Sequence, residues 1–571
     1  MPDSVPLVVG VTGHRDLVPE EIPVLRKRVL EFFSELRSAF PQLPIMVMTP
    51  LAEGADRLVA DVAKELGFPT VVLLPMDRHL YQADFQGDSL SEFHEMMELG
   101  ETIELPLVGD NTEEDITHGV ARDQQYEQLG AYLAAHSHIL LALWDGKLST
   151  SKGGTGHVVQ FHQHDISELI AEGQHRSPID FAEDESDLVY HIVCSRMEEG
   201  GPIEPLVAGE AHWLTRDDVR PRSDEMPVRY LVVFQRMSEF NEDLRKPVAT
   251  SDHEPPLINE SGEFQIDRAT DIERLYQRAN LLAQRYQRLV AASLKGTYVL
   301  ALLAGVSFIV YADLPEIQYV EYLIYLYLIF IALVLLILLV DRRGGWHRKH
   351  LDYRSLAEAL RVQFYWSVAG VQMTNPSRFS HDSFLRRQDL ELGWIRNVMR
   401  FAGRHADAAS HTVTDNATNS VVKEWVGDDN SGQMYYFRKK SGERSLQGKL
   451  TSLMGTLCFV LGVSVAVALA VFHSFGQSID KPVSDVLIAL MGLLPLVAII
   501  RQQYAHRTAE HELFNQYTYM YRIFSNANRL LGNAATTEIK RDILLALGES
   551  ALDEQGQWIL RQRERPLSVS K

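Results

Sequence analysis

The chain has 571 residues, too many for a single hydrophobic core, so at least two compact units are expected. The formal net charge of −21 argues against a nucleic-acid polymer as partner, because neutralising phosphates requires clustered Lys and Arg, but one nucleotide is not excluded. With only two cysteines, neither a disulfide framework nor a Cys-based zinc site is expected. The N-terminal stretch lacks the pattern of a signal peptide, which predicts that the first part of the chain stays in the cytoplasm.

Residues 1–245 alternate short apolar runs with helical patterns, which is typical of an α/β domain with a parallel sheet covered by helices. The expected strands cover 6–12, 44–51, 70–76, 138–144, 187–195 and 228–235. The expected helices cover 19–40, 54–67, 123–136 and 157–173, and a long polar insertion separates the third strand from the third helix.

Three glycine-containing loops fall at or just after the ends of expected strands: GVTGHRD (10–16), TPLAEGADRL (49–58) and GGTGH (153–157). Bare backbone N–H groups at the start of a helix can hold a phosphate, and ligands of open α/β sheets bind at the carboxyl ends of strands. Each loop alone is better explained as a turn, but three on one sheet edge favour nucleotide binding. Neither the G-x-G-x-x-G fingerprint nor a G-x-x-x-x-G-K-[ST] P-loop occurs in these loops.

The motifs VTGHRD, EGADRL, LLALWDG and GGTGH together resemble the SLOG superfamily over about residues 5–240. These are Rossmann-like domains related to the LOG phosphoribohydrolases, to DprA and to the N-terminal region of TRPM channels. The resemblance implies recognition of a nucleotide or an ADP-ribose-type molecule, with no other cofactor. It implies that the following residues line the ligand pocket: Gly13, His14, Arg15, Gly54, Ala55, Asp56, Arg57, Trp144, Asp145, Gly153, Gly154, Thr155, Gly156 and His157.

One departure from the LOG enzymes bears on catalysis. The position of their catalytic Glu is occupied by Gln160, an amide that cannot act as a general base. This favours a sensor without a catalytic residue over a hydrolase, although Asp56 or Asp145 can in principle substitute. His157, His162 and His164 are interpreted as ordinary surface histidines, with a metal site as the alternative, so no metal is predicted.

After a linker at 246–267, four apolar windows near 20 residues in length predict transmembrane helices at 296–312, 319–340, 450–472 and 483–500. The alternative is four buried helices of a large soluble core, but helices apolar on every side are rare outside membranes. In the third window, Gly462, Ala466 and Ala470 recur every four residues, a spacing that lets another helix approach closely.

Lys and Arg flank the outer ends of both pairs of windows, as in DRRGGWHRKH (341–350) and FRKKSGERSLQGK (437–449), whereas the loops within each pair are nearly free of them. By the positive-inside rule, both hairpins point outward, and the N- and C-termini are cytoplasmic. The predicted location is the inner (plasma) membrane, with the lipid bilayer as a partner.

A helix rich in Tyr, Arg and Ala that leads into a two-span hairpin resembles the SLATT modules, and the pattern occurs twice, at 268–383 and at 384–571. The resemblance implies membrane disruption or pore formation after ligand sensing, in bacterial antiphage or conflict defence, by a homo-oligomer. The function expected is a ligand-gated membrane effector. The alternatives are a membrane-anchored nucleotide-processing enzyme, such as an N-glycosidase, and a scaffold without a ligand.

Overall fold

The computed structural model describes residues 4–98, 100–147, 153–163, 188–215, 222–247, 255–258, 266–314, 318–373, 379–384, 390–409, 413–475, 480–508 and 510–563. The chain forms two compact units. The sheet unit comprises Met1–Arg278, Leu356–Thr418 and Leu544–Gly556, and the helical unit comprises Ala279–Ser355, Asn419–Ile543 and Gln557–Lys571. These two units do not coincide with the four consecutive segments expected from the sequence (1–245, 246–267, 268–383 and 384–571), because each unit combines stretches that lie far apart along the chain.

The sheet has eight strands in the order β4-β3-β2-β1-β5-β6-β7-β8. The strands are β1 (Leu7–Gly13), β2 (Ile45–Thr49), β3 (Thr70–Leu74), β4 (Gly100–Glu104), β5 (Ile139–Trp144), β6 (Val189–Val193), β7 (Ala211–Leu214) and β8 (Arg222–Ser223). From β4 to β6 all neighbours are parallel, and β7 and β8 are antiparallel additions at one edge. Strands β2, β3, β5 and β6 are buried along their whole length, as continuous apolar runs predict for a sheet covered on both faces.

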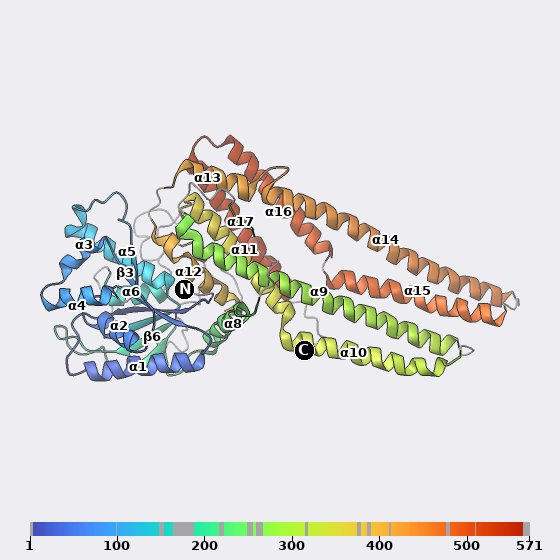
Figure 1. The fold of residues 1–571 in the computed structure, drawn as a ribbon, viewed down its shortest axis with the longest axis horizontal. Coiled ribbons are helices and arrows are strands. Elements are labelled where there is room, and N and C mark those ends of the chain that lie inside the picture. The colour runs from blue at the N-terminus through green and yellow to red at the C-terminus, as the bar shows by residue number, and fades with distance from the viewer. Residues whose placement is uncertain are drawn as a thin grey trace. The chain divides into compact units, whose positions relative to one another are not determined.

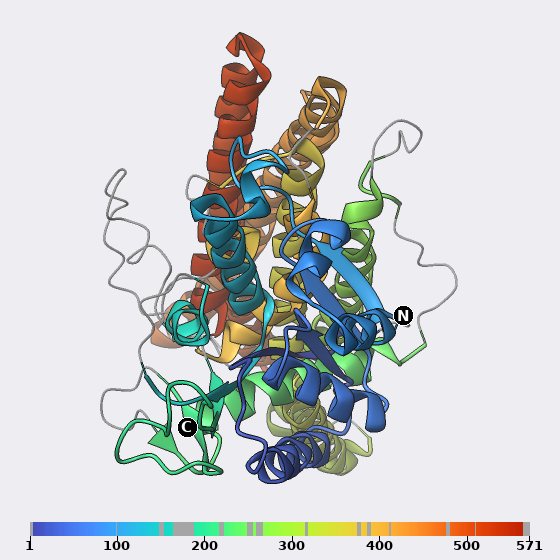
Figure 2. The ribbon, with the colours of Figure 1, turned by 90° about the vertical axis from the view of Figure 1, so that its left-hand side faces the viewer.

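Helices cover the two faces in pairs. α1 (Ile22–Ala39) contacts α2 (Ala55–Glu65), whereas α5 (Val120–His136) contacts α6 (Thr155–Gln163). Figures 1 and 2 show α1 on one side of the sheet and α5 on the other. The buried residues of α1 are spaced by three and four, so a single face of the helix packs on the sheet: Leu25, Val29, Phe32, Phe33 and Leu36.

The prediction of a strand at 228–235 is wrong, because the structure has the helix α8 (Val228–Leu244) there. The apolar run VRYLVVFQ has strand-like composition, but burial at intervals of three and four continues to the end of the helix, beyond that run. At the amide of Asn241, Nδ2 donates to the carbonyl of Val5 at 2.9 Å, and Oδ1 accepts the N–H of Val5 at 2.9 Å. Tertiary contacts with the start of β1 therefore fix α8 as a helix.

The polar insertion before α5 contains more structure than the sequence pattern indicated. It holds α3 (Arg78–Tyr81), η1 (Gln82–Asp84), α4 (Asp88–Met97), the edge strand β4 and η2 (Asp115–Thr117). Tyr81, Phe85 and Phe93 pack their rings on one another, and this aromatic cluster joins the insertion to a core that also contains residues of α2 and β3.

Later parts of the chain complete the sheet unit. They include part of α11 (Trp346–Ala369), η5 (Ser380–Ser383), η6 (Leu390–Leu392), α12 (Gly393–Ala408), part of α13 (Asp415–Val421) and part of α17 (Thr537–Arg563). From α12, Arg400 donates to the carbonyl of Ser137 at 3.2 Å, and the carbonyl of Asn397 lies 2.9 Å from Nε2 of His138. The indole N–H of Trp366 donates to the carbonyl of Leu544 at 2.9 Å. Residues 1–245 are therefore only part of this unit.

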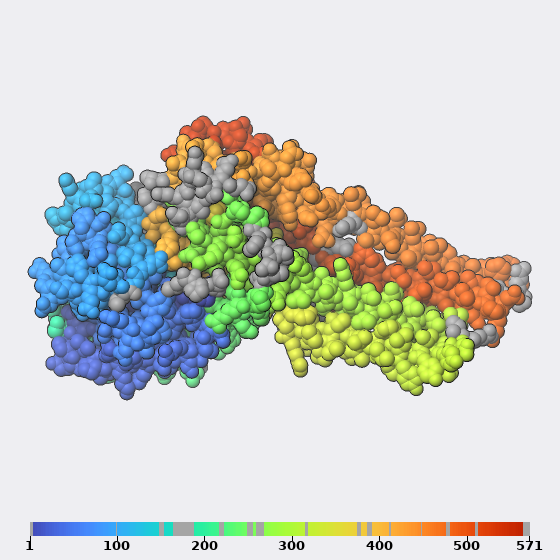
Figure 3. All heavy atoms as spheres, in the orientation of Figure 1, coloured from blue at the N-terminus to red at the C-terminus, as the bar shows by residue number. Residues whose placement is uncertain are grey.

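The helical unit contains four helices long and apolar enough to cross a membrane, and they coincide with the four predicted windows. They are α9 (Thr270–Asp313, which starts in the sheet unit after η3, Ile266–Ala269), α10 (Leu323–Gly344, after η4, Val320–Tyr322), α14 (Gly432–Ser474) and α15 (Lys481–Arg507). The π-helix η7 (Val422–Val426) precedes α14, and α16 (Glu510–Asn533) follows α15. At most 11% of each apolar window is buried, and α10 and α14 lie at the surface of the unit in Figure 3. Such exposed apolar surface is far larger than a water-soluble protein tolerates.

Small residues mark the close contacts among these helices. A Cβ built on Gly462 would lie 2.7 Å from Cδ of Pro495 in α15, and one on Gly305 of α9 would lie 2.4 Å from Cδ2 of Leu496. A Cβ built on Gly296 of α9 would lie 3.4 Å from Cδ1 of Ile337 in α10. Within the predicted stripe, Gly462 is buried, whereas Ala466 is half-buried and Ala470 exposed, so the close approach is centred on Gly462.

Candidate functional site

The predicted loops lie around the point where the strand order reverses. β1 is central, the chain moves outward through β2, β3 and β4 on one side, and it then returns to add β5 and β6 on the other. In open α/β sheets such a reversal leaves a crevice outside the carboxyl ends of the two central strands, and ligands bind there. His14 follows β1 directly and Asp145 follows β5, so both border this crevice.

His14 and Asp145 join the two loops. The backbone N–H of Asp145 donates to Nε2 of His14 at 3.1 Å, and the carboxylate Oδ1 of Asp145 lies 3.1 Å from the same nitrogen. Burial lowers the pKa of His14, although the charge of Asp145 opposes it. The neutral ring therefore predominates at pH 7, with Nε2 as acceptor and the proton on Nδ1.

Asp145 is held by its own loop and keeps one oxygen without a hydrogen bond. Its Oδ1 accepts the N–H of Lys147 at 3.0 Å. Among the described residues Oδ2 has no hydrogen-bond partner, and the ammonium of Lys147 is 3.5 Å away. Trp144 is 6% exposed and donates its indole N–H to the carbonyl of Lys147 at 3.0 Å, which is the environment of a packing residue rather than of a ring open to a base.

The glycines of the first two loops allow these loops to touch. A Cβ on Gly13 would lie 2.3 Å from Cβ of Ala55, and one on Gly54 would lie 2.3 Å from the carbonyl oxygen of Arg15. Gly54 also has φ of +76°, a conformation that favours glycine. Because the N–H of Ala55 donates to the carbonyl of His14 at 3.1 Å, one of the N-terminal donors of α2 is already occupied. The start of α2 is thus closed against the loop after β1.

Arg57 has a structural environment. It is 4% exposed, donates to the carbonyl of Leu51 at 3.2 Å and to the carboxylate of Glu92 at 2.7 Å, and stacks over the ring of Phe85. With a further hydrogen bond to Ser89, these contacts attach α2 to α4. Its guanidinium is therefore committed to the fold, unlike that of a ligand-binding Arg.

Asp56 differs from its neighbour. The side chain is 3% exposed, Oδ2 accepts the N–H of Ala52 at 3.2 Å, and Oδ1 has no hydrogen-bond partner within the described part of the chain. Burial raises its pKa to about 7, although the Ala52 N–H and the charges of Arg15 and Arg57 act in the opposite direction. A buried carboxyl group with a pKa near neutrality can exchange a proton at physiological pH.

Arg15 is the predicted cation that remains available. Its side chain is exposed, and among the described residues it makes no hydrogen bond or ion pair. Desolvation lowers its pKa, but neighbouring groups that include Tyr81, Tyr126 and Asp84 outweigh this effect and raise it. The guanidinium therefore stays charged and lies within electrostatic range of α3, η1 and α5.

The third loop reaches the same neighbourhood through Tyr126. Gly153 has φ of +76°, and a Cβ there would lie 2.8 Å from Cβ of Tyr126. The N–H of Gly153 donates to Nδ1 of His157 at 3.0 Å, and α6 starts at Thr155 with the N–H of Val158 bonded to the carbonyl of Gly154. The first N–H groups of any α-helix lack intrahelical acceptors, so this end is suited to an anion. Gly156 is buried against the sheet, and residues 148–152 lie outside the described residues.

Sequence reasoning missed three polar residues beside Arg15. The hydroxyl of Tyr126 donates to Asp84, and Nη2 of Arg122 is 2.5 Å from Oδ1 of Asp84. Burial and the hydrogen bond to Asp84 raise the pKa of Tyr126 to about 12. These residues come from the polar insertion and from α5, where no motif or spacing marks them.

A surface hollow of about 260 Å³ lies elsewhere, after β3 and β4. Its lining consists of Asp77, Leu80, Glu104, Leu105, Pro106, Leu107, Glu113 and Ala408. Three carboxylates make it unattractive for a phosphate, and none of the predicted ligand residues belongs to it.

Comparison of the chain with protein-family models, with curated proteins and with solved structures found no match. Function must therefore be argued from the site itself.

Proposed function

We propose that this chain is a bacterial ligand-gated membrane effector in which a SLOG-like, Rossmann-like sensor binds a nucleotide-derived anion and drives SLATT-like membrane modules. The observation that carries the proposal is the convergence of the loops after β1 and β5 at the reversal of strand order, beside an exposed Arg15 without hydrogen-bond or ion-pair partners in the described part of the chain. A guanidinium and the backbone N–H groups at the start of α6 are complementary to phosphate oxygens.

The ligand class follows from what surrounds these donors. The neutral ring of His14 offers a hydrogen-bonding group suited to a ribose hydroxyl, and Tyr126 offers an aromatic ring. Phosphate and ribose together specify a nucleotide or an ADP-ribose-type molecule. The closed start of α2 leaves Arg15 and α6 as the anion-binding groups of the proposed pocket.

The membrane function rests on the four apolar helices. The close approach of Ile337 to the backbone at Gly296, and of Pro495 to the backbone at Gly462, supports two antiparallel hairpins, α9–α10 and α14–α15. Basic residues at the outer ends of both hairpins support cytoplasmic termini in a plasma membrane. Ser464 and Thr456 donate their hydroxyls to carbonyls of their own helix, at 2.8 and 3.0 Å. The proposed pore is formed by several copies of the chain, as the resemblance to SLATT modules implies.

Coupling between sensing and the membrane needs a physical connection. The single helix α9 runs from Thr270 in the sheet unit to Asp313 in the helical unit, so no loop interrupts the chain at that passage. A ligand opens the assembly only if it binds the open arrangement better than the closed one. A shift at the start of α9 is the step that we assign to this difference.

The test uses the full-length protein in lipid vesicles loaded with a fluorescent dye. ADP-ribose, NAD and a panel of linear and cyclic nucleotides are added, and dye release and the thermal unfolding midpoint are recorded. Arg15→Glu and Gly154→Asp should abolish the response to the active compound while leaving membrane insertion intact. Lys27→Glu is the matched control, because it makes the same charge change on an exposed side chain of α1.

Retained ligand binding by both site variants would refute the pocket. Ligand binding without dye release would instead refute gating.

A second candidate function is hydrolysis of the N-glycosidic bond of a nucleotide. Asp56, with its pKa near 7 and one oxygen without a hydrogen-bond partner among the described residues, is the group that favours it, because Gln160 cannot handle a proton. Full-length protein incubated with NAD, ADP-ribose and nucleoside monophosphates should then release free base or nicotinamide, and Asp56→Asn should stop it. Absence of any released base would leave the sensor as the better description.

A further inference from the structure

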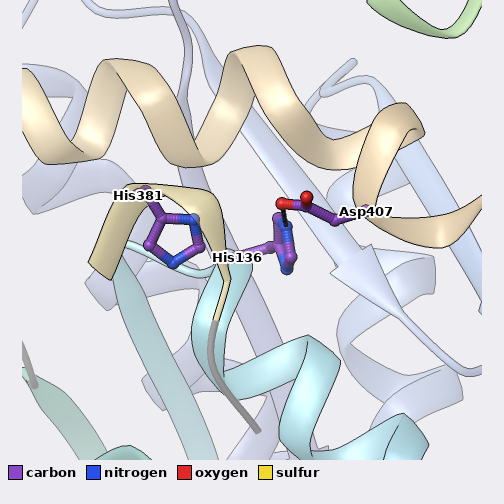
Figure 4. A group of neighbouring side chains, drawn as sticks. All are labelled: His136, His381 and Asp407. Carbon is purple, nitrogen blue, oxygen red and sulfur yellow. Dashed lines mark hydrogen bonds and ion pairs between the residues drawn. The ribbon is translucent and has the colours of Figure 1, made fainter. Parts of the chain in front are cut away.

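A second cluster of polar side chains lies in the sheet unit, away from the loops described above. His136 is the last residue of α5, His381 belongs to η5, and Asp407 lies near the end of α12. One ring nitrogen of each histidine and one carboxylate oxygen all lie within 4.8 Å of one another. Figure 4 shows the ring of His136 between the other two side chains, with His381 on one side and Asp407 on the other.

His136 is oriented as a metal ligand is. Its Nδ1 lies 3.0 Å from the carbonyl of Tyr132, one turn earlier in α5, so the proton of the neutral ring belongs on Nδ1. Nε2 then presents a lone pair to Oδ2 of Asp407 at 3.1 Å. Two acceptors at this distance repel each other unless a cation or a proton lies between them. Metal-bound histidines commonly have the other nitrogen fixed by a carbonyl in this way.

His381 lacks the hydrogen bonds that a buried imidazole needs. It is 0% exposed, and neither ring nitrogen has a hydrogen-bond partner within the described residues. The nearest acidic group is Oδ1 of Asp382, at 3.4 Å from Nε2. Leaving a buried polar group without a partner is unfavourable, and a metal ion would offset this cost. The ring of Phe379 stacks on His381 and holds it in place.

The charges around the cluster are mixed. Arg396 and Arg400 lie within electrostatic range of His381, and burial together with these charges keeps its pKa well below the ordinary value. The two guanidinium groups themselves oppose a bound cation. The carboxylates of Asp407 and Asp382 offset the positive charge on the other side.

We propose that His136, His381 and Asp407 bind one divalent transition-metal ion, with Zn²⁺ as the expected occupant. Two imidazole nitrogens and a carboxylate oxygen suit zinc, at bond lengths of about 2.0–2.2 Å. A tetrahedral ion places its ligand atoms roughly 3.3 Å apart. The 3.1 Å between Nε2 of His136 and Oδ2 of Asp407 already matches this spacing, and the remaining ligand separations, of at most 4.8 Å, have to shorten when the ion binds. A water molecule would supply the fourth ligand.

Such an ion would have a structural role. The three ligands come from parts of the chain separated by more than 240 positions (136 to 381), and burial excludes substrate from the site. The ion would fasten η5 and α12 to α5, and hence complete the sheet unit. This proposal is independent of the one for the ligand-binding loops.

Full-length protein purified without chelators should contain about one zinc ion per chain by elemental analysis. After removal of the metal, Co²⁺ should bind in its place and give the visible absorption of a four-coordinate site. His381→Ala and Asp407→Asn should each weaken binding at least about tenfold. Asp407→Asn serves where His381→Ala does not fold, because it preserves shape and removes only the charge.

His138→Ala is the matched control. His138 is buried in the same unit, but the N–H of Val8 and the carbonyl of Asn397 occupy its two nitrogens, at 3.1 and 2.9 Å. This variant should lose stability and keep its metal. Wild-type protein that is free of metal and binds neither Zn²⁺ nor Co²⁺ would overturn the proposal, and so would variants of His381 and Asp407 that keep a full complement.

Discussion

The buried carboxyl of Asp56 makes the stability of the sheet unit depend on pH. Its pKa of about 7 in the folded chain lies above the ordinary 3.8, so the folded state binds a proton more tightly than the unfolded state does. The contribution of Asp56 to stability is therefore most favourable below pH 4, and this contribution falls as pH rises from about 4 to about 7. The difference of roughly three pH units between the two pKa values corresponds to a loss of about 4 kcal/mol in the free energy of unfolding above pH 7, relative to low pH.

Asp56→Asn removes this cost, because an amide is neutral at every pH and still accepts the N–H of Ala52. We expect the variant to unfold at a higher temperature than the wild type at pH 8, by on the order of 10 °C, and to show little advantage at pH 4. An amide N–H left without an acceptor would reduce the gain somewhat.

The assay is thermal unfolding of full-length protein in detergent, followed by intrinsic fluorescence between pH 4 and pH 8. Asp61→Asn, on the exposed side of the same helix, is the control and should change the midpoint by a similar small amount at all pH values. If Asp56→Asn gained no more at pH 8 than at pH 4, the carboxyl would be ionised at little cost, and its assignment as a proton-exchanging group would be wrong.

Two glycine substitutions test close contacts in the two units. Gly54→Ala should destabilise the sheet unit by about 3 kcal/mol, because positive φ and a 2.3 Å approach to the carbonyl of Arg15 act together. Its control is Gly67→Ala, which has φ of +71° and open space and should cost only about 1 kcal/mol; equal effects of the two variants in thermal unfolding would contradict the close approach. Gly462→Val should separate α14 from α15 and lower the unfolding midpoint in detergent by the equivalent of about 1–3 kcal/mol, and Gly455→Val, with no atom within 4 Å, should be tolerated; similar losses in both would show that the helices do not meet at Gly462.

Most of the sheet was predictable because its strands are short continuous apolar runs bounded by turn residues. The exception at 228–235 shows the limit of this argument. An apolar run of eight residues fits a strand or a buried helix equally well, and contacts that stabilise this helix, such as that of Asn241 with Val5, come from more than 230 residues away. The edge strand β4 was hidden for a different reason: only Ile103 of its five residues is buried.

The loops of the proposed ligand site were partly predictable as loops. Glycine followed by polar residues after a strand is a local signal, and it pointed to the segments that contain Arg15, Asp56 and the start of α6; ligand binding by them stays a prediction. It did not separate residues that face the crevice from those committed to packing, such as Arg57 and Trp144, because that depends on neighbours distant in sequence. For the same reason no spacing indicated that His136 and His381 lie together.

The discontinuous construction of the sheet unit has a consequence for biogenesis. Its last piece, residues 544–556, leaves the ribosome after all four apolar helices have been made. This piece supplies the carbonyl of Leu544, which accepts the hydrogen bond of the Trp366 indole, and Gly548, against which the same ring lies. Nascent chains therefore hold an incomplete sheet unit while their hydrophobic segments are being made. We expect a chain that stops before residue 544 to reach the bilayer and yet to lack a fully folded sheet unit.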